Sequence, residues 1–513
     1  MANELLVAID LGTTGCRTVI FNKGGEMISY HYEEYPTIFP SPSCVEQDAS
    51  EWWRATCNTA KTALKKAGID SHDIRGISVT NQRETIVPVD IDGEPLRKAI
   101  IWQDRRATAE CDEIREKIGA GNIYTLTGLT VDPYFSAPKI LWIKRNESNI
   151  FQKAHKFLLV HDYLIKKLTG QFVTDYSNAS RTMLFDIKKL DWSSRICDEL
   201  EIPKEKMPAL CPSARAIGEI TTKASKETGF TPGTPVVSGA GDQQAAAVGV
   251  GVTQTGRVKA TTGTGTFILA FLNEPQYDEK RRVLCSCHAV PGKWVNEASI
   301  FTTGAVYRWF RDQFAQSEKE EAKKTGRDPY DLLNEAASKI PPGSRGVMVI
   351  PHCMGSGAPH WNPYDKGVMI GFTLGHEKGS LIRAIMEGTA FEIKENIEVM
   401  KELKTEIREL RVTGGATRSQ TWNQITADVT GVTVLKGAIE EATSLGAAIL
   451  AGVGAGIYKG VADAADKMVT ITEKYSPNNE NLQLYSKLFD IYERTYKALS
   501  DEKIFEDLSS IIS

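Results

Sequence analysis

A turn rich in glycine and threonine occurs twice in this sequence, about half the chain apart, and each copy lies between two short apolar segments. The first copy, DLGTTG at residues 10–15, follows the apolar segment 5–9, and the second, TTGTGT at 261–266, follows the segment 258–260. Glycines at a hairpin tip let backbone N–H groups approach an anion closely, and threonine hydroxyls add further donors. One such turn is an ordinary hairpin feature. Two of them, the first with an acid at its mouth, predict two lobes that bind a polyphosphate.

The composition is that of a soluble globular protein with no large excess of either charge. The 513 residues are 41% hydrophobic and 25% charged, and 61 basic against 65 acidic side chains give a net charge of -4. This balance does not indicate a nucleic-acid-binding surface. No apolar run is long enough to span a membrane, and the first ten residues lack the cationic segment of a signal peptide. We therefore expect neither a nucleic acid nor a membrane as a partner.

The cysteines and histidines do not form a metal-binding or disulfide pattern. Nine cysteines, an odd number, are scattered along the chain without a C-x-x-C pair. This usage favours reduced thiols and a cytoplasmic location over a disulfide framework or a zinc site. Cys353 lies between His352 and His360, and without further ligands we interpret these two histidines as structural.

Apolar strand patterns alternate with amphipathic helix patterns along the chain, which predicts an α/β fold. The length is sufficient for two or three domains with a large core. The best-marked helix has Asp48 at its N-cap, Glu51 as its capping-box partner and Gly68 at its end, with residues 52–66 between them.

Three predicted strands end in polar or glycine-rich clusters, which is where α/β proteins place their ligands. The strands and the clusters that follow them are 76–80 with 81–84, 235–238 with 239–244, and 410–412 with 413–416. We place a domain boundary near residue 250, after the helix that follows the second cluster. This gives an N-terminal lobe of residues 1–250 and a C-terminal lobe of residues 251–513.

The acid at the first turn has two interpretations. The chain has no G-x-x-x-x-G-K-[ST] phosphate loop and no H-R-D, D-F-G or G-x-S-x-G motif, so the turns are the remaining phosphate sites. Asp10, at the end of a strand, is placed to hold Mg²⁺ through waters while the turn binds nucleotide phosphates. The alternative is that Asp10 only stabilises its own turn.

A second acid, Asp242, is the candidate general base. It stands between a predicted strand and an alanine-rich helix, and Gln243 follows it with an amide that can bind hydroxyls. A carboxylate within hydrogen-bond reach of a hydroxyl can take its proton during phosphoryl transfer. From the residues alone, a role as the N-cap of the following helix is equally consistent.

A charged pair and two aromatic residues complete the candidate substrate site. Arg83 and Glu84 follow a strand, and such a pair can donate to and accept from vicinal hydroxyls, which suits a polyol; the alternative is a structural ion pair. Trp102 and Tyr134 are able to pack against a carbon skeleton, although aromatic residues are more often part of a core.

At these residues the chain resembles the FGGY family of carbohydrate kinases, and within it the glycerol kinase branch. The resemblance runs nearly from end to end. The motifs that carry it are DLGTT at 10–14, NQRET at 81–85, WQDRR at 102–106, DPYFS at 132–136, TDYSNASRT at 174–182, GDQQ at 241–244, GTG at 263–265 and GSGAP at 355–359. So many matches in the same order make chance agreement negligible.

The resemblance implies an α/β fold of two actin-like, ribonuclease-H-like lobes with ATP and a polyol or sugar in the cleft between them. It implies Asp242 as the base and Asp10 as the Mg²⁺ site. The residues that it assigns to the substrate are Arg83, Glu84, Trp102, Tyr134, Asp242 and Gln243. The residues that it assigns to the nucleotide are Thr13, Thr14, Arg17, Thr264, Gly304 and Gly415.

The chain departs from glycerol kinases at several positions. Gly15 stands where a serine is usual, and Arg308 and Ser419 replace a glutamine and an asparagine near the nucleotide. The segment 414–424 is more similar to xylulokinase-type members. The resemblance implies ATP- and Mg²⁺-dependent phosphorylation of glycerol at a terminal hydroxyl, with another polyol or a ketose as the alternative substrate. A homodimer is compatible with this interpretation.

Overall fold

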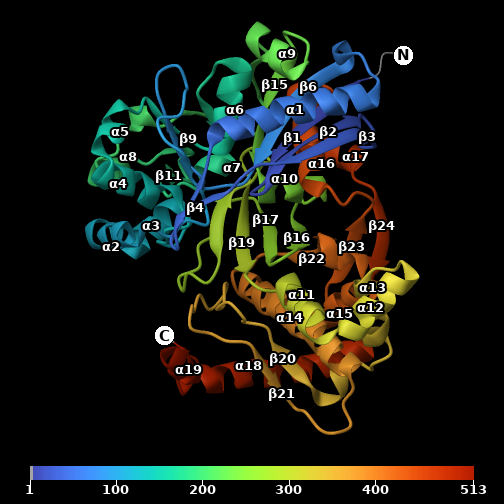
Figure 1. The fold of residues 1–513 in the computed structure, drawn as a ribbon. Coiled ribbons are helices and arrows are strands. Elements are labelled where there is room, and N and C mark those ends of the chain that lie inside the picture. The colour runs from blue at the N-terminus through green and yellow to red at the C-terminus, as the bar shows by residue number, and fades with distance from the viewer. Residues whose placement is uncertain (1–3, 513) are drawn as a thin grey trace. The chain divides into compact units, whose positions relative to one another are not determined.

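The computed structural model describes residues 4–512, which divide into two compact units (Figure 1). The first unit consists of the chain up to Gln254 together with Phe271–Val295 and Glu441–Thr470. The second unit consists of Thr255–Ala270, Asn296–Glu440 and the chain from Ile471 onward. Where one boundary near residue 250 was expected, two later segments therefore pack with the first unit, and both units are discontinuous in sequence. No helix within the described chain is both long and apolar enough to cross a membrane.

The first unit is built on a six-stranded sheet in the order β14-β15-β6-β1-β2-β3. Its strands are β1 (Leu5–Leu11), β2 (Gly15–Asn22), β3 (Met27–Glu34), β6 (Ile74–Asn81), β14 (Ala216–Glu219) and β15 (Pro235–Gly241). The central strands β15, β6 and β1 are parallel, and β2, β3 and β14 are antiparallel to their neighbours. Each strand predicted from the sequence in this unit is present and is one to four residues longer at one or both ends.

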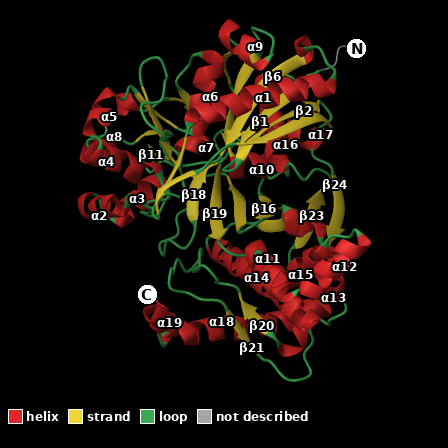
Figure 2. Cartoon of the chain, viewed as in Figure 1, coloured by secondary structure: helices red, strands yellow, loops and turns green. Residues whose placement is uncertain are grey.

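Helices cover both faces of this sheet, which is why β1 is apolar on both of its sides (Figure 2). Helices α1 (Ala49–Ala67) and α6 (Val160–Thr169) pack on one face, and α10 (Asp242–Gly249) and α16 (Ala442–Gly454) on the other. Helices α10 and α16 cross so closely that a Cβ atom on Gly446 would lie 1.8 Å from the Ala245 carbonyl oxygen. This crossing fixes the helix that begins at Asp242.

Helix α1 confirms most of the capping prediction and corrects one part of it. Asp48 is the N-cap and accepts a hydrogen bond from the Ser50 amide, and Gly68 ends the helix with a φ of 60°. Glu51 is not a capping-box partner, because its carboxylate binds Arg54 one turn further along the helix. An arginine within reach on the same face competes with the N-cap amide for the glutamate.

The remaining elements of the first unit surround this sheet. They are β4 (Ile38–Ser41), β5 (Cys44–Gln47), β7 (Val87–Val89), β8 (Ala99–Ile100), α2 (Thr108–Lys117), α3 (Ala120–Thr127), α4 (Ser136–Asn146), α5 (Ser148–Lys153), β9 (Lys156–Leu158), β10 (Val173–Asp175), α7 (Tyr176–Ala179), β11 (Phe185–Asp186), β12 (Asp191–Trp192), α8 (Ser194–Glu199), β13 (Ala209–Cys211), α9 (Thr222–Thr228), β18 (Leu284–Cys287) and α17 (Val461–Met468).

The strands of the second unit follow the order β19-β17-β16-β22-β23-β24 within their sheet. Their bounds are β16 (Gly256–Thr262), β17 (Thr266–Leu272), β19 (Trp294–Ile300), β22 (Ile407–Thr413), β23 (Thr433–Gly437) and β24 (Ile471–Tyr475). The second glycine–threonine turn joins the antiparallel strands β16 and β17, as the sequence predicts. Strand β22 lies parallel to β16, so the end of β22 is beside the start of this turn.

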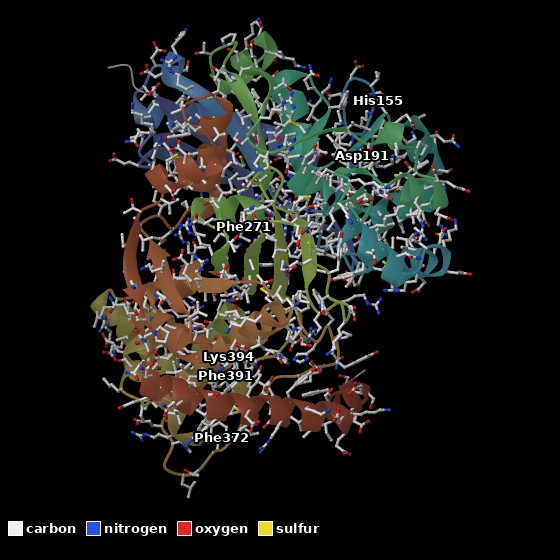
Figure 3. The ribbon with its side chains drawn as sticks, turned by 180° about the vertical axis from the view of Figure 1, so that it is seen from behind. His155, Asp191, Phe271, Phe372, Phe391 and Lys394 are labelled. Carbon is white, nitrogen blue, oxygen red and sulfur yellow. The ribbon has the colours of Figure 1, made fainter. Side chains whose placement is uncertain are left out.

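Helices of the second unit pack around α14 (Lys378–Glu402), on which Figure 3 labels Phe391 and Lys394. Phe391 contacts aromatic rings of α18 (Asn479–Asp501), and the Lys394 ammonium group lies 4.8 Å from the centre of the Phe489 ring. The other elements are α11 (Gly304–Phe314), α12 (Gln316–Thr325), α13 (Pro329–Ser338), β20 (Met348–Ile350), β21 (Val368–Ile370), α15 (Gln420–Thr430) and α19 (Ile504–Ile512).

Candidate active site

The register of the first sheet brings three predicted site segments to one edge. Leu11 of β1 pairs with Asn81 of β6, and Asn81 pairs with Gly241 of β15. The carboxyl ends of three adjacent parallel strands therefore coincide, and the residues at or just beyond them lie close together. These are Asp10, the Arg83–Glu84 pair and Asp242.

Asp242 is the first residue of α10, and Gly241 occupies the N-cap position. One carboxylate oxygen, Oδ1, lies 3.3 Å from Nε of Arg83 and accepts a hydrogen bond of 2.7 Å from the Gln243 amide. The side chain of Asp242 is 31% exposed, whereas Arg83 is buried. The carboxylate is therefore held on one side by protein and is open to solvent, which is the arrangement that a general base needs. The alternative role as the N-cap of α10 is wrong.

Arg83 and Glu84 belong to a longer chain of buried charges. The carboxylate of Glu84 is 3.9 Å from Nε of Arg83 and 2.6 Å from Nε of Arg181, and all three side chains are at most 2% exposed. Glu84 has a φ of 64°, an uncommon backbone conformation for a residue with a side chain. The Ser136 hydroxyl donates to its carbonyl oxygen at 3.0 Å. Sequence reasoning quoted Arg181 only within a motif and missed its contact with Glu84.

The two predicted aromatic residues form one wall beside these charges. The Trp102 and Tyr134 rings meet edge to face with centroids 5.7 Å apart, and the Arg181 guanidinium lies 5.8 Å from the centre of the Tyr134 ring. The indole N–H of Trp102 donates to the Thr13 hydroxyl at 2.9 Å. Trp102 thus links the candidate substrate residues to the first turn, and both rings are only half-buried.

A buried lysine supports this wall from behind. Nζ of Lys139, on α4, donates to the carbonyl oxygens of Tyr134 and Phe135, the latter at 3.0 Å. Burial lowers the pKa of Lys139 from 10.5 to about 7, against the opposing effect of Glu84 and nearby aspartates. No sequence signal marked this lysine, because lysines are common on helices.

Asp10 lies in an environment that disfavours its negative charge. Burial and the negative charge of Asp242 together raise the pKa of Asp10 from 3.8 to about 7, while Arg17 acts in the opposite direction. Two carboxylates that repel each other favour a cation beside them, and hard oxygen donors suit Mg²⁺. The turn itself is closed by backbone, with the Gly12 amide donating to the Gly15 carbonyl at 3.0 Å. The residues present therefore fit a magnesium ion.

The other residues predicted at the first turn surround it. Thr13 accepts the Trp102 hydrogen bond, and the hydroxyl of the exposed Thr14 is 3.1 Å from that of Tyr32. Arg17 forms an ion pair with Glu441, at the start of α16. The guanidinium of Arg17 is thus already paired with a carboxylate.

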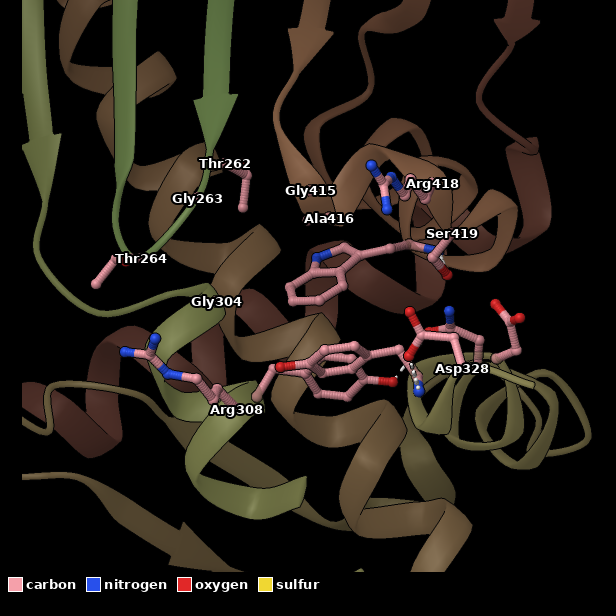
Figure 4. Close-up of a pocket in the computed structure, with 15 residues that line it drawn as sticks. Thr262, Gly263, Thr264, Gly304, Arg308, Asp328, Gly415, Ala416, Arg418 and Ser419 are labelled. Atoms are coloured by element: carbon pink, nitrogen blue, oxygen red, sulfur yellow. Dashed lines mark hydrogen bonds between the residues drawn. The ribbon is translucent and has the colours of Figure 1, made fainter. Parts of the chain in front are cut away.

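The second unit contains a cavity of about 310 Å³ beside the second turn (Figure 4). The three nucleotide positions predicted in this unit, Thr264, Gly304 and Gly415, all line it, and so do the two departures, Arg308 and Ser419. The other lining residues are Thr262, Gly263, Tyr307, Asp328, Tyr330, Asp331, Asn334, Ala416, Arg418 and Trp422. The structure therefore brings together the three residues of the second unit that the sequence assigned to the nucleotide.

The cavity has a polar rim and an aromatic side. The Gly304 amide donates to the Gly263 carbonyl at 3.0 Å, which fixes the start of α11 on the turn. Tyr307 stacks on Tyr330 with centroids 5.3 Å apart and meets Trp422 edge to face at 5.1 Å. Ser419 caps α15 by accepting from the Trp422 amide. The hydroxyl of Ser419 therefore stabilises the start of this helix.

Known proteins decide the family. The sequence model of the N-terminal domain of the FGGY family of carbohydrate kinases matches residues 5–249, and the model of the C-terminal domain of that family matches residues 258–455. This chain belongs to the FGGY family of carbohydrate kinases. Glycerol kinase 2 of Thermotoga maritima is 38% identical over 498 residues, which cover 94% of this chain and 97% of that protein. Glycerol kinase 2 of Saccharolobus solfataricus is 38% identical over 93% of this chain and 94% of its own length.

Solved structures of FGGY kinases have the same two-domain α/β fold. Xylulose kinase from Rhodospirillum rubrum superposes with a TM-score of 0.89 at 26% identity, covering 98% of this chain and all of that one. Plasmodium falciparum glycerol kinase with ADP gives a TM-score of 0.86 at 25% identity, covering 96% and 98% of the two chains. The predicted family, fold class and enzyme class are confirmed: this FGGY kinase is a phosphotransferase that acts on an alcohol group.

The two histidines that the sequence left as structural each pair with a glutamate of α14. Nε2 of His352 is 3.2 Å from Glu392, and Nε2 of His360 is 2.8 Å from Glu395. Across residues 4–512, no group of three or more histidine, cysteine or acidic side chains is arranged to hold a metal ion. All nine cysteines of the chain are free thiols.

Proposed function

We propose that this FGGY kinase transfers the terminal phosphoryl group of ATP to a terminal hydroxyl of glycerol, giving sn-glycerol 3-phosphate. The observation that carries the proposal is the partly exposed carboxylate of Asp242, held by Arg83 at the strand edge where Glu84 also lies. The relatives at 38% identity are named glycerol kinases, which supports glycerol over other alcohols.

The residues of the first unit supply the acceptor chemistry. We assign Arg83 and Glu84 to the hydroxyls that do not react, because one donates and the other accepts. Trp102 and Tyr134 face the carbon skeleton, and Gln243 offers an amide beside the base. Asp242 takes the proton of the reacting hydroxyl as its oxygen attacks the phosphorus, and the nucleoside diphosphate leaves with the bonding electron pair.

The nucleotide contacts are assigned to both units. Thr13, Thr14 and Arg17 in the first unit, and Thr264, Gly304 and Gly415 in the second, are the residues proposed to bind ATP. Asp10 would hold Mg²⁺, which when bound neutralises charge on the phosphates. The division into a substrate lobe and a nucleotide lobe remains part of this proposal. The sequence placed these lobes at 1–250 and 251–513, and the two compact units differ from that division by the segments 271–295 and 441–470.

A second candidate is a kinase of another polyol or a ketose. The xylulose kinase and gluconate kinase structures that share the fold favour it, with TM-scores of 0.89 and 0.88 at 26% and 25% identity. A site that hydrogen-bonds each substrate hydroxyl rejects an analogue that lacks one of them by a large factor, because buried polar groups are left unpaired, so kinetics can decide the acceptor.

The test is a comparison of kcat/KM for glycerol, erythritol, xylitol, xylulose and gluconate with ATP and Mg²⁺. We expect glycerol to be the best acceptor by at least tenfold. The variant Asp242→Asn keeps the shape but removes the base, and kcat should fall by about 10²- to 10⁴-fold. The matched control is Asp191→Asn, which makes the same change at an exposed aspartate on β12. Equal turnover of glycerol and a pentitol would overturn the substrate, and near-normal turnover by Asp242→Asn would overturn the base.

A further inference from the structure

Three side chains line up across the first three strands of the chain. Asp10 of β1 is directly opposite Arg17 of β2, and Arg17 is directly opposite Tyr32 of β3. Residues that are directly opposite on neighbouring strands point to the same face of a sheet. Tyr32 therefore shares a face with the candidate magnesium ligand and with a predicted nucleotide residue, although it lies outside every motif identified in the sequence.

Gly15 is what allows Tyr32 to reach the first turn. A Cβ atom at residue 15 would lie 2.7 Å from both Cζ and Oη of Tyr32, and 2.5 Å from the Glu33 carbonyl oxygen. These separations are too short for any side chain, so the tyrosine ring occupies the space in which a larger residue at position 15 would project. The departure from serine at this position thus coincides with a hydroxyl that arrives from β3.

The ring is fixed so that its hydroxyl faces the turn. Oη of Tyr32 is 3.1 Å from the hydroxyl oxygen of Thr14, which is exposed. The Arg17 guanidinium lies 5.4 Å from the centre of the Tyr32 ring, within the range of a cation–π contact. Nε of Arg17 is buried and has no hydrogen-bond partner among residues 4–512. A hydroxyl donor from β3 thus lies at the turn that is proposed to bind phosphate, with the Arg17 guanidinium of β2 against its ring.

We propose that Tyr32 is a further phosphate-binding residue of the first turn. A hydroxyl can donate one hydrogen bond and accept others, so when one hydroxyl of the Thr14–Tyr32 pair donates to its partner, the partner's hydrogen is available for a phosphate oxygen. The pair then presents a hydroxyl donor at the turn, in the region where Gly15 has no side chain. This inference rests on the proposed function, because it takes the bound anion to be the phosphate chain of the nucleotide.

The competing explanation is that Tyr32 only packs β3 onto the turn. Packing by the ring does not require the hydroxyl, whereas a phosphate contact does. The two explanations therefore differ in what the removal of a single oxygen atom does to nucleotide affinity.

The experiment measures equilibrium binding of Mg²⁺-ATP and of adenosine by calorimetry, without an acceptor alcohol, for wild type and Tyr32→Phe. Because a hydrogen bond to a charged group is stronger than one between neutral groups, its loss should raise the Kd for ATP at least about tenfold. The Kd for adenosine, which has no phosphate, should not change, and neither should the melting temperature, because the ring remains. Tyr30→Phe, on the same strand and 48% exposed, is the matched control.

A double-mutant cycle with Thr14→Val tests whether the two hydroxyls act as a unit. We expect the losses of ATP affinity in Tyr32→Phe and Thr14→Val to be strongly non-additive. The inference is overturned if Tyr32→Phe binds ATP as tightly as wild type, or if ATP and adenosine weaken equally. Failure of the proposed function has a different signature, since the wild type would then phosphorylate no alcohol while its ATP binding could still be measured.

Discussion

At the scale of single residues, the site depends on charges that alternate in sign. Asp242, Arg83, Glu84 and Arg181 follow one another at distances between 2.6 and 3.9 Å. A buried charge is tolerated only when a partner compensates it, and removal of one partner from a buried pair costs several kcal/mol. The two residues at the ends of this series differ in exposure, because the Asp242 side chain is partly exposed and the Arg181 side chain is buried. Arg181 is therefore a positioning residue that acts through Glu84 and Tyr134.

Replacement of Arg181 should separate the kinetics of the two substrates. In Arg181→Met the Glu84 carboxylate loses its 2.6 Å partner and the Tyr134 ring loses its cation, so we expect the KM for the acceptor alcohol to rise at least tenfold. The KM for ATP should stay within twofold, and steady-state kinetics with each substrate varied in turn checks both values. Arg145→Met, which removes a half-exposed arginine on α4, is the control. An equal rise in both KM values would mean that Arg181 serves only the stability of the unit.

The sequence allows the prediction of site residues that belong to strand ends and turns, and misses those that do not. Asp10 lies at the end of an apolar strand, and Arg83, Glu84 and Asp242 each follow one, so the strand pattern predicts their placement at strand ends. Arg181 is 97 residues from Glu84 along the chain and has no local signal of its own. Its contact depends on how α7 and the following loop pack, which periodicity does not specify.

At the scale of elements, the first turn of α4 contains a buried lysine. Lys139 lies in the first turn of this helix, where a positive charge is disfavoured by the helix dipole, and its side chain is fully buried. Its donors satisfy the carbonyl oxygens of Tyr134 and Phe135, which precede the helix. Lys139 donates to carbonyl oxygens and is therefore not a helix cap, so capping reasoning from the sequence, which succeeded for Asp48 of α1 and failed for Glu51, could not find it.

Lys139 should give the folded protein a measurable dependence of stability on pH. Its pKa is lowered to about 7 from 10.5, so between these pH values the unfolded chain holds more protons than the folded one, and stability rises with pH. Relative to Lys139→Met, the wild type should gain about 2 kcal/mol in unfolding free energy between pH 6.5 and pH 9. Urea denaturation of both proteins at the two pH values provides the measurement. Lys144→Met, which removes a more exposed lysine of the same helix, is the control, and a flat difference across the pH range would contradict the predicted titration.

At the scale of the whole molecule, the chain passes between its two units more than once. The sequence supported one boundary near residue 250, yet 271–295 and 441–470 pack with the first unit. Composition and motif order do not reveal such returns, because a segment that crosses into another unit has the same apolar pattern as its neighbours. The consequence for the site is specific. Glu441, which pairs with Arg17, is about 200 residues beyond the expected end of its own unit.

The assignment of the acceptor alcohol to the first unit and of ATP to the second can be tested with two glycines that line the second-unit cavity. A Cβ atom on Gly304 would lie 2.1 Å from the Gly263 carbonyl oxygen, so Gly304→Ala must displace the turn and should lower the melting temperature. A Cβ atom on Gly415 meets nothing within 4 Å, so Gly415→Ala should fold like wild type and intrude only on a ligand in the cavity. We expect both variants to raise the KM for ATP several-fold and to leave the KM for the acceptor unchanged.

The control for these variants is Gly121→Ala in α3, where an added Cβ atom also meets nothing within 4 Å. The informative variant is Gly415→Ala, because its effect on ATP cannot come from a disturbed fold if the melting temperature is unchanged. A normal KM for ATP in Gly415→Ala would show that the cavity does not hold the nucleotide beside that residue. A raised KM for the acceptor alone would reverse the assignment of substrate to the first unit and nucleotide to the second. Because Gly304→Ala also displaces the turn, Gly415→Ala is the variant whose effect on ATP locates the nucleotide independently of stability.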